Sequence, residues 1–441
     1  MSLFTDELHI HLYGCLSAMD VWTLGRDRYR KMSARLDWYA SEYAAAYGRT
    51  PDYLHYWEQD HGFELLQNDF LFTKHGSFAQ FQACFNLMIA LFPAVPGDTT
   101  ILEHVLKAQR AQGLRYGEYR CFTPPYLNDE QIMTFVGAAA DAAARIDQDS
   151  GGQFKPRLAF SISRDVAQGL RQHQAIRAAL MGHAERQRVV TGLDFCGVEA
   201  GHPPGPMAPL FSAIHRANQE HPPGALAILY HVGESFDDMS VMSAMRWVWQ
   251  AHQLGAHRLG HATALGLDLA ALAGTTHVRE GVAERLDHLA WLEVQAPWLA
   301  QRGHLIDVQE IKAERARLAG LPVDASTQVS YDEAAITAAR SLQSALLQDL
   351  TAAGAIVESC PTSNLRIGRI ADPLHHPLIR FVAAGLTTVV SSDDPGIFAV
   401  DLDHEERVCR SELKLSDAVL QDLQATNREV WSETLSQRQG F

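Results

Sequence analysis

Short apolar runs recur along the chain, and most are followed by a longer segment whose apolar residues repeat at helical spacing. Eight such runs lie at 7–12, 114–122, 155–162, 189–195, 225–231, 258–261, 355–360 and 386–392. Apolar runs of this length predict buried strands, whereas apolar residues three or four positions apart predict amphipathic helices. The helices are expected at 129–146, 166–181, 207–220, 239–252, 377–384, 404–413 and 417–434. Strands that alternate with helices indicate a parallel sheet, and eight strands predict an α/β fold of the (β/α)8 TIM-barrel type.

Two stretches are longer than a crossover between parallel strands requires. The first follows the first strand, with helices expected at 20–29, 32–43, 78–91 and 100–112 around a less regular segment at 46–73. The many aromatic residues of this segment would line a pocket or, in the interpretation that we favour, form core. The second lies between the sixth and seventh strands, with helices expected at 267–273, 283–295, 308–319 and 331–352. We interpret it as a helical lobe of about 265–350, inserted into a single domain of 1–441. The lobe would cap the pocket, form an interface in a homo-oligomer, or only decorate the surface.

Composition and charge narrow the range of partners. The chain has 441 residues, 47% of them hydrophobic, and a formal net charge of -15, which argues against nucleic acid or an anionic membrane as partner. The six cysteines are dispersed without a Cys-x-x-Cys pair, which indicates reduced thiols and not a disulfide framework. The sequence opens without a secretory signal pattern and contains no apolar run of about 18 residues. We therefore expect a cytoplasmic protein with a small-molecule substrate.

Polar residues gather where the predicted strands end. They are His9 and His11 on the first strand, Asp194 and Gly197 on the fourth, His231 and Glu234 on the fifth, His261 on the sixth, Glu358 within the seventh, and Asp393 and Asp394 on the eighth. Residues two apart in a strand point to the same side, so both imidazoles of the His-x-His pair would enter one space. A single buried histidine is usually a satisfied core residue. Four histidines and an aspartate at four strand ends instead predict a metal site on the face where barrels carry their active sites.

Five motifs at these positions resemble, in the same order, those of the adenosine deaminase family of the metal-dependent amidohydrolase superfamily. They are Leu8-His9-Ile10-His11-Leu12, His231-Val232-Gly233-Glu234, Gly260-His261, Cys360-Pro361-Thr362-Ser363-Asn364 and Ser392-Asp393-Asp394-Pro395. The resemblance extends from residue 7 to about 400. It implies a (β/α)8 barrel and zinc-dependent hydrolytic deamination of an adenine-type purine or nucleoside to the 6-oxo product and ammonia.

The resemblance also implies a set of metal ligands. His9, His11, His231 and Asp393 would hold one Zn²⁺, which lowers the pKa of bound water toward about 7. Binuclear relatives usually have a bridging carboxylated lysine or a glutamate, often on the fourth strand. The run Thr191-Gly192-Leu193-Asp194-Phe195 contains no lysine, which favours one metal per chain. Zinc is the default for such ligands, although iron and manganese accept similar ones.

The remaining residues of the motifs would act on the purine. By resemblance, Glu234 protonates ring N1, and the backbone N–H of Gly197 approaches N3. Asp394 hydrogen-bonds N7, which requires a proton on one of the two partners. His261 would orient the attacking water, take its proton or stabilise the developing charge. Asp393 would also hydrogen-bond this water.

Tyr13 departs from the family pattern, in which an aspartate that contacts the ribose 5′ end is common at this position. A tyrosine would stack on a base, fill the ribose space, donate one hydrogen bond to a modified 5′ group, or turn aside. The substrate therefore stays open between adenosine, adenine and their 5′- or N6-modified relatives. Two alternatives remain: an amidohydrolase that cleaves a different C–N bond, and a catalytically silent member with a binding role. Glu234 and Asp394 favour a purine substrate, because a purine offers a ring nitrogen for each of these carboxyls to protonate or hydrogen-bond.

Overall fold

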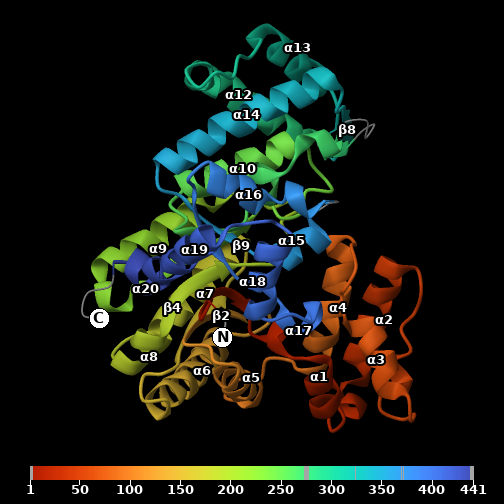
Figure 1. Cartoon of the computed structure of the whole chain (residues 1–441), viewed down its shortest axis with the longest axis vertical. Helices are drawn as coiled ribbons and strands as arrows, with labels where there is room; N and C mark the ends of the chain where they lie inside the picture. Colours follow the sequence, from red (N-terminus) through yellow and green to blue (C-terminus); the bar gives the residue numbers. More distant parts are fainter. Residues whose placement is uncertain (1–2, 273–277, 323, 369, 371, 438–441) are drawn as a thin grey trace.

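The computed structural model describes residues 3–272, 278–322, 324–368, 370 and 372–437. Eight parallel strands form one sheet, and the predicted (β/α)8 barrel is confirmed (Figure 1). In order around the sheet they are β1 (Asp6–His11), β2 (Tyr116–Phe122), β3 (Lys155–Ser161), β4 (Val190–Phe195), β5 (Ala227–Val232), β6 (Arg258–His261), β9 (Ile356–Ser359) and β10 (Thr387–Val390). The ends of the chain close the barrel, because the N–H of His11 donates to the carbonyl of Asp393 at 2.9 Å and the N–H of Asp393 to that of His9 at 3.0 Å.

Helices surround the sheet, with the apolar core between the two layers. The outer layer contains α6 (Asp129–Asp149), α7 (Val166–Leu180), α8 (Ala184–Val189), α9 (Ala208–Glu220), α10 (Val241–Gln253), α16 (Pro377–Ala383) and α19 (Asp417–Glu429). Local sequence explains where such helices begin. In α6, for example, Asn128 accepts from the N–H of Gln131, whose side chain returns the bond, and a run of buried alanines then lets the helix pack closely on β3.

The stretch after β1 forms α1 (Ala18–Gly25), α2 (Ser33–Tyr47), α3 (Gly62–Phe70), α4 (Phe78–Leu91) and α5 (Thr100–Ala111). The first four form a group beside the barrel (Figure 1). Helix α3 lies inside the segment for which no regular structure was expected. Its buried Asp69 accepts hydrogen bonds from the hydroxyls of Tyr43 at 3.3 Å and Tyr56 at 2.7 Å. The aromatic residues here therefore surround a buried carboxylate, and this tertiary contact stabilises a helix that the local sequence pattern did not reveal.

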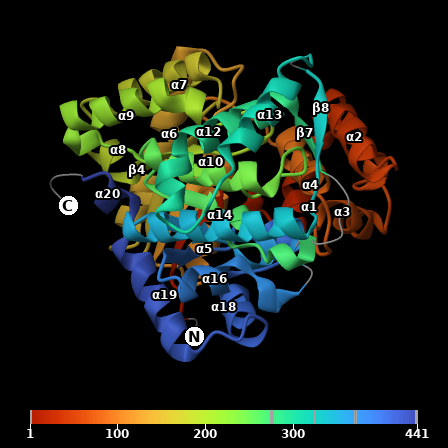
Figure 2. The same ribbon diagram turned by 90° about the horizontal axis from the view of Figure 1, so that it is seen from above.

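The lobe between β6 and β9 contains α11 (Thr263–Gly266), α12 (Val282–Ala300), α13 (Val308–Leu318) and α14 (Glu333–Ala352). Helices α12, α13 and α14 lie at one end of the molecule (Figure 1), the end that faces the reader in Figure 2. An antiparallel ribbon of β7 (Val278–Gly281) and β8 (Ser326–Val329), which the sequence pattern did not predict, joins its two halves. The helix expected at 267–273 is a short 3-10 turn at Leu269–Leu272, and residue 273 lies outside the described residues. Helix α14 packs on α10 and precedes β9 in the chain. It therefore also forms the helical crossover between β6 and β9.

The last part of the chain contains α15 (Pro361–Ile367), α17 (Pro395–Phe398), α18 (Leu402–Ser411), α19 and α20 (Ser432–Leu435). The single helix expected at 417–434 is interrupted at residues 430–431. The ring of Trp431 stacks on Tyr116 at 4.1 Å, and the N–H of Ser432 donates to Glu118 at 2.8 Å. These contacts with β2 accompany the break between α19 and α20. No helix among the described residues is long and apolar enough to cross a membrane.

Helix α18 carries a carboxyl group that makes stability depend on pH. Glu405 is fully buried and accepts from the N–H of Thr362 at 3.0 Å, and burial raises its pKa from 4.5 to about 8. Between these two values the unfolded chain has lost a proton that the folded chain retains. The free energy of unfolding is therefore expected to fall as the pH rises through this range, by at most about 1.4 kcal/mol per pH unit.

The variant Glu405→Gln removes this titration. Its thermal midpoint should depend less on pH than that of the wild type, and its relative stability should be greatest at pH 8. Thermal unfolding at pH 5.5 and pH 8 measures the difference, with the exposed Glu412→Gln as control. Parallel pH dependences for the wild type and Glu405→Gln would contradict the assignment.

Candidate active site

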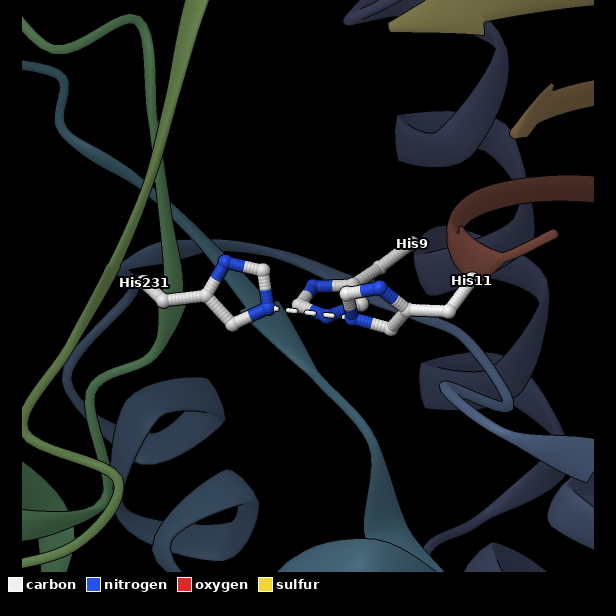
Figure 3. Close-up of side chains that lie close together, drawn as sticks. All are labelled: His9, His11 and His231. Carbon is white, nitrogen blue, oxygen red and sulfur yellow. Dashed lines mark hydrogen bonds between the residues drawn. The ribbon is translucent and has the colours of Figure 1, made fainter. Parts of the chain in front are cut away.

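Three imidazoles converge where β1 and β5 end. His9 and His11 point to the same side of β1, and His231 approaches them from β5 (Figure 3). The Nε2 atoms of His11 and His231 lie 3.3 Å apart, and Asp393 Oδ1 lies 3.4 Å from Nε2 of both His9 and His11. The structure thus brings together the four residues that the sequence suggested as metal ligands. No second cluster of this kind exists among the described residues, because all three candidate ligand groups share members of this one.

The donor atoms fit a divalent metal. Burial lowers the pKa of His11 to about 3 and that of His231 to about 4, so both rings are neutral and carry a free lone pair. His9 Nε2 makes no hydrogen bond within the described part of the chain. Burial lowers the pKa of His9, but the nearby carboxylates of Glu358 and Asp393 have the larger combined effect, and the pKa of His9 is raised. Negative charge around this ring is what a site for a cation requires. Three imidazole nitrogens and one carboxylate are a typical zinc donor set.

Buried carboxylates lie behind two of the ligands. Nδ1 of His9 lies 2.8 Å from Glu358 Oε2, and Nδ1 of His231 lies 3.0 Å from Asp194 Oδ1. Such partners fix the orientation of a ligating ring and leave Nε2 for the metal. The sequence pattern placed Glu358 and Asp194 on strands of this rim of the barrel, but we assigned neither residue a function from it.

A buried arginine, which sequence reasoning missed, connects these carboxylates. Arg120 reaches Glu358 at 2.5 Å and Asp194 at 3.3 Å, while Arg258 holds the other oxygen of Glu358 at 2.7 Å. Burial alone would raise the pKa of both carboxyls, but the nearby cations, with His231 beside Asp194, keep the pKa of each well below its usual range. Charged residues at alternate positions of an apolar strand, Glu118 and Arg120, were the available sequence signal.

The tautomer of His261 follows from its neighbours. The N–H of Cys360 donates to Asn364 Oδ1 at 3.1 Å, so the Asn364 amide presents its N–H₂ to His261 Nδ1 at 2.9 Å. Burial lowers the pKa of His261, and the neutral ring then carries its proton on Nε2, which lies 3.6 Å from Glu234 Oε1. His261 is thus arranged to donate a hydrogen bond into the site.

Strained backbone also marks this rim of the barrel. His261 and Asp393 both adopt left-handed φ values, of 62° and 65°. A non-glycine residue in this region costs about 1–3 kcal/mol and persists only where the surroundings impose it. Here the strain directs both side chains into the space between the strand ends.

Three neighbouring carboxyls differ in protonation. Burial opposes ionisation of Asp393, but the surrounding histidines keep its pKa well below the usual range. Burial raises the pKa of both Glu234 and Asp394 well above theirs, and the negative charge of Asp393 raises both further. One ionised carboxylate therefore lies beside two that retain a proton. Divergent environments of this kind separate a ligand or base from groups able to donate a proton.

The Asp394 side chain is positioned against the backbone of Gly14. A Cβ on Gly14 would lie only 1.7 Å from Asp394 Oδ1. We expect Gly14→Ala to displace the carboxyl and lower kcat/KM about 10- to 100-fold, as for a lost hydrogen bond to a charged or polarised partner, with the metal retained. Steady-state kinetics with metal analysis test this. The control is Gly205→Ala, where a Cβ meets no atom within 4 Å. Unchanged kinetics for Gly14→Ala would remove Asp394 from the substrate contacts.

Two predicted substrate contacts lie further from this cluster. Tyr13 is half-buried and lines a cavity with Arg28, Asp98 and apolar side chains of α5 and α6, which none of the four metal-ligating side chains lines. Gly197 lies two residues past β4 with φ 84°, and no atom lies within 4 Å of a Cβ built on it, so its backbone is open to approach. The structure thus places Gly197 on the rim of the site, and it places Tyr13 toward the outer helices.

Comparison with known proteins begins with sequence. The model of the adenosine deaminase family matches residues 59–290 and 310–432. The adenosine deaminase of Shewanella loihica is 40% identical over 85 residues, 19% of this chain and 26% of that protein. The aminodeoxyfutalosine deaminase of Acidothermus cellulolyticus is 46% identical over 61 residues, 14% of this chain and 17% of that protein. The alignments thus span about a quarter of these relatives or less.

Solved structures show the same fold over nearly the whole chain. The adenine deaminase of Arthrobacter aurescens has a TM-score of 0.58 and 17% identity, covering 98% of this chain and 96% of that one. A Burkholderia ambifaria amidohydrolase with bound Zn has a TM-score of 0.55 at 14% identity, covering 97% and 85%. Arabidopsis ADAL complexed with IMP has a TM-score of 0.55 at 16% identity, covering 98% and 92%.

The matched residues include the strand ends that carry His231, His261 and Asp393, whereas His9 and His11 precede them. The fold joins these two histidines to the matched residues, because closure of the barrel places β1 between β2 and the end of β10. The resemblance suggested by the motifs is thereby confirmed, and the chain belongs to the adenosine deaminase family.

Proposed function

We propose that this protein catalyses the hydrolytic deamination of a 6-aminopurine, as free base or nucleoside, to the 6-oxo product and ammonia. One zinc would be held by His9, His11, His231 and Asp393, and when bound it would supply water of lowered pKa, so that hydroxide is available at neutral pH. The observation that carries the proposal is the combination of this ligand cluster with two adjacent buried carboxyls, Glu234 and Asp394.

Each surrounding group has a proposed task on the purine. The Glu234 carboxyl donates its proton to ring N1 as water adds to C6, and the protonated Asp394 donates a hydrogen bond to N7, which can only accept. The Gly197 N–H approaches N3. His261 carries its proton on Nε2, so it orients the attacking water and stabilises the developing charge, which the tautomer favours over proton abstraction.

The substrate proposed is adenine, adenosine or a 5′- or N6-modified relative. The relatives named above act on adenosine, aminodeoxyfutalosine and adenine, and another of similar fold is an N6-methyl-AMP deaminase from Arabidopsis. Tyr13 stands where an aspartate is common in the family, and its cavity is mostly apolar, with Arg28 and Asp98 paired at 3.7 Å. This environment favours a substrate without a free ribose 5′-hydroxyl.

The test is ammonia release by zinc-loaded protein whose metal content has been measured. The substrates are adenine, adenosine, 2′-deoxyadenosine, AMP, 5′-thio-modified adenosines and N6-substituted adenines. We expect turnover of at least one, with the 6-oxo purine as product, and a kcat at least about 100-fold lower for Glu234→Gln carrying the same metal. Protein that holds one zinc per chain but releases no ammonia from any of them would overturn the proposal. It would favour cleavage of a different C–N bond or a binding role.

A further inference from the structure

A buried carboxylate holds the turn that carries Glu234. Glu199 lies four residues past β4 and is only 6% exposed. Its Oε2 accepts from the N–H of Gly233 at 2.7 Å, and its Oε1 accepts from the N–H of Glu234 at 3.0 Å. Gly233 has a left-handed φ of 71°, which turns both N–H groups toward the same carboxylate. Glu199 thus acts as a cap on the turn that ends β5.

A buried arginine fixes the same region from the other side. One nitrogen of Arg164 donates to the carbonyls of Phe195 and His231, each at 2.7 Å. Its guanidinium lies 4.7 Å from the ring centre of Tyr230, which limits its movement. Arg164 therefore ties the ends of β4 and β5 together, and Glu199 ties the next two residues of the chain to the loop that follows β4.

The Glu234 side chain needs this support because it has little of its own. Its carboxyl makes no hydrogen bond to any other described residue, and the nearest histidine nitrogen, His261 Nε2, is 3.6 Å away. Its place in the site is consequently set by the backbone from which it extends. A proton donor displaced by about 1 Å can lose 100-fold in rate, so this backbone matters for catalysis.

We propose that Glu199 and Arg164 are positioning residues that together set Glu234 for proton transfer to the substrate. The inference rests on the proposed function, and it adds two residues to the reaction that the sequence motifs did not contain. Neither side chain contacts the side chain of a proposed metal ligand, and Arg164 meets His231 only at its backbone carbonyl. Loss of Glu199 should therefore affect the chemical step more than binding of the metal or the purine.

Glu199→Gln is the first test, because it preserves size and replaces one acceptor oxygen by an N–H₂ group that faces a backbone N–H. We expect kcat to fall about 10- to 100-fold with KM and metal content nearly unchanged. Hydrogen exchange of the peptide over 230–236 should become faster in the zinc-loaded protein. Glu199→Asp keeps both acceptors one methylene shorter and should recover part of the lost rate.

A double substitution distinguishes a positioning role of Glu199 from a general disturbance of the structure. In a Glu234→Gln background, Glu199→Gln should lower kcat by less than about twofold, because the residue it positions is already inactive. The matched control is Glu280→Gln, which alters another buried glutamate, one that accepts from the N–H of Ser240 at 3.1 Å in the lobe. This control should leave kcat and the exchange of 230–236 unchanged.

Three outcomes would overturn the positioning role. They are an unchanged kcat in Glu199→Gln despite faster exchange, an equal loss of kcat in the Glu234→Gln background, and loss of metal in Glu199→Gln. Exchange that stays unchanged would overturn the contact itself. Failure of the proposed function would look different, because the wild type would then release no ammonia while the exchange measurement could still be made.

Discussion

Replacing Glu234 with glutamine is expected to lower kcat by about 10²- to 10⁴-fold, the range over which general acids contribute, while the protein retains its metal. The carboxyl is buried beside Asp393, and both features raise its pKa, so at neutral pH it carries the proton that ring N1 needs. Glutamine has nearly the same shape and cannot deliver a proton. Because Glu234 is not among the groups of candidate ligands, metal binding should be unaffected.

The measurement combines steady-state kinetics with metal analysis of the same preparation. Glu280→Gln again serves as the matched control, since it removes a buried carboxyl from the lobe and should leave turnover intact. A Glu234→Gln protein with normal turnover would show that another group protonates the substrate. If the variant instead loses its metal, then Glu234 contributes to the metal site and its assignment as acid is wrong.

The second large effect is expected from Asp393→Ala, which should lose metal and activity together. Its carboxylate lies 3.4 Å from Nε2 of both His9 and His11, and the surrounding histidines keep it ionised despite burial. Removal of groups that only orient ligands costs about 10- to 100-fold in metal affinity, so removal of a direct ligand should cost more than about 100-fold. Competition with a chelator measures this loss.

Two further variants isolate the cause. Asp393→Asn tolerates the left-handed φ of 65° and keeps the side-chain shape, so it tests the charge alone and should also lose metal. Asp394→Asn changes the adjacent carboxyl to an amide that can still donate a hydrogen bond to N7, so the metal should stay bound. Full activity with bound metal in Asp393→Ala would exclude it as a ligand, and metal loss in Asp394→Asn would reassign that residue.

Much of the site could be anticipated because it depends on local rules. In a strand, His9 and His11 must point to one side, and in a barrel the ends of parallel strands meet on one rim. Strand ends inferred from apolar runs therefore place His231, His261, Asp393 and Asp394 together from the sequence alone. The helices with strong caps or alanine-rich faces, such as α4 and α6, were located by the same local information.

The limits of these local rules explain where the structure differs from the sequence prediction. Helix α3, the ribbon of β7 and β8, and the break before α20 all depend on partners far away in sequence, and no periodic pattern reveals such partners. Tyr13 shows the same limit within the site. Its position after His11 suggested a substrate contact, and only the structure shows the cavity that it lines with Arg28, Asp98 and side chains of the outer helices.

The sequence by itself determined the barrel, the rim that carries the site and the identity of its first layer of residues. Only the tertiary structure decided how these residues are held and which of them keep a proton. Glu358 lies 349 positions from His9, and Glu199 lies 35 from the N–H of Glu234. Orientation and protonation depend on burial and on charges within a few ångströms, and the distances that set both exist only after the chain has folded.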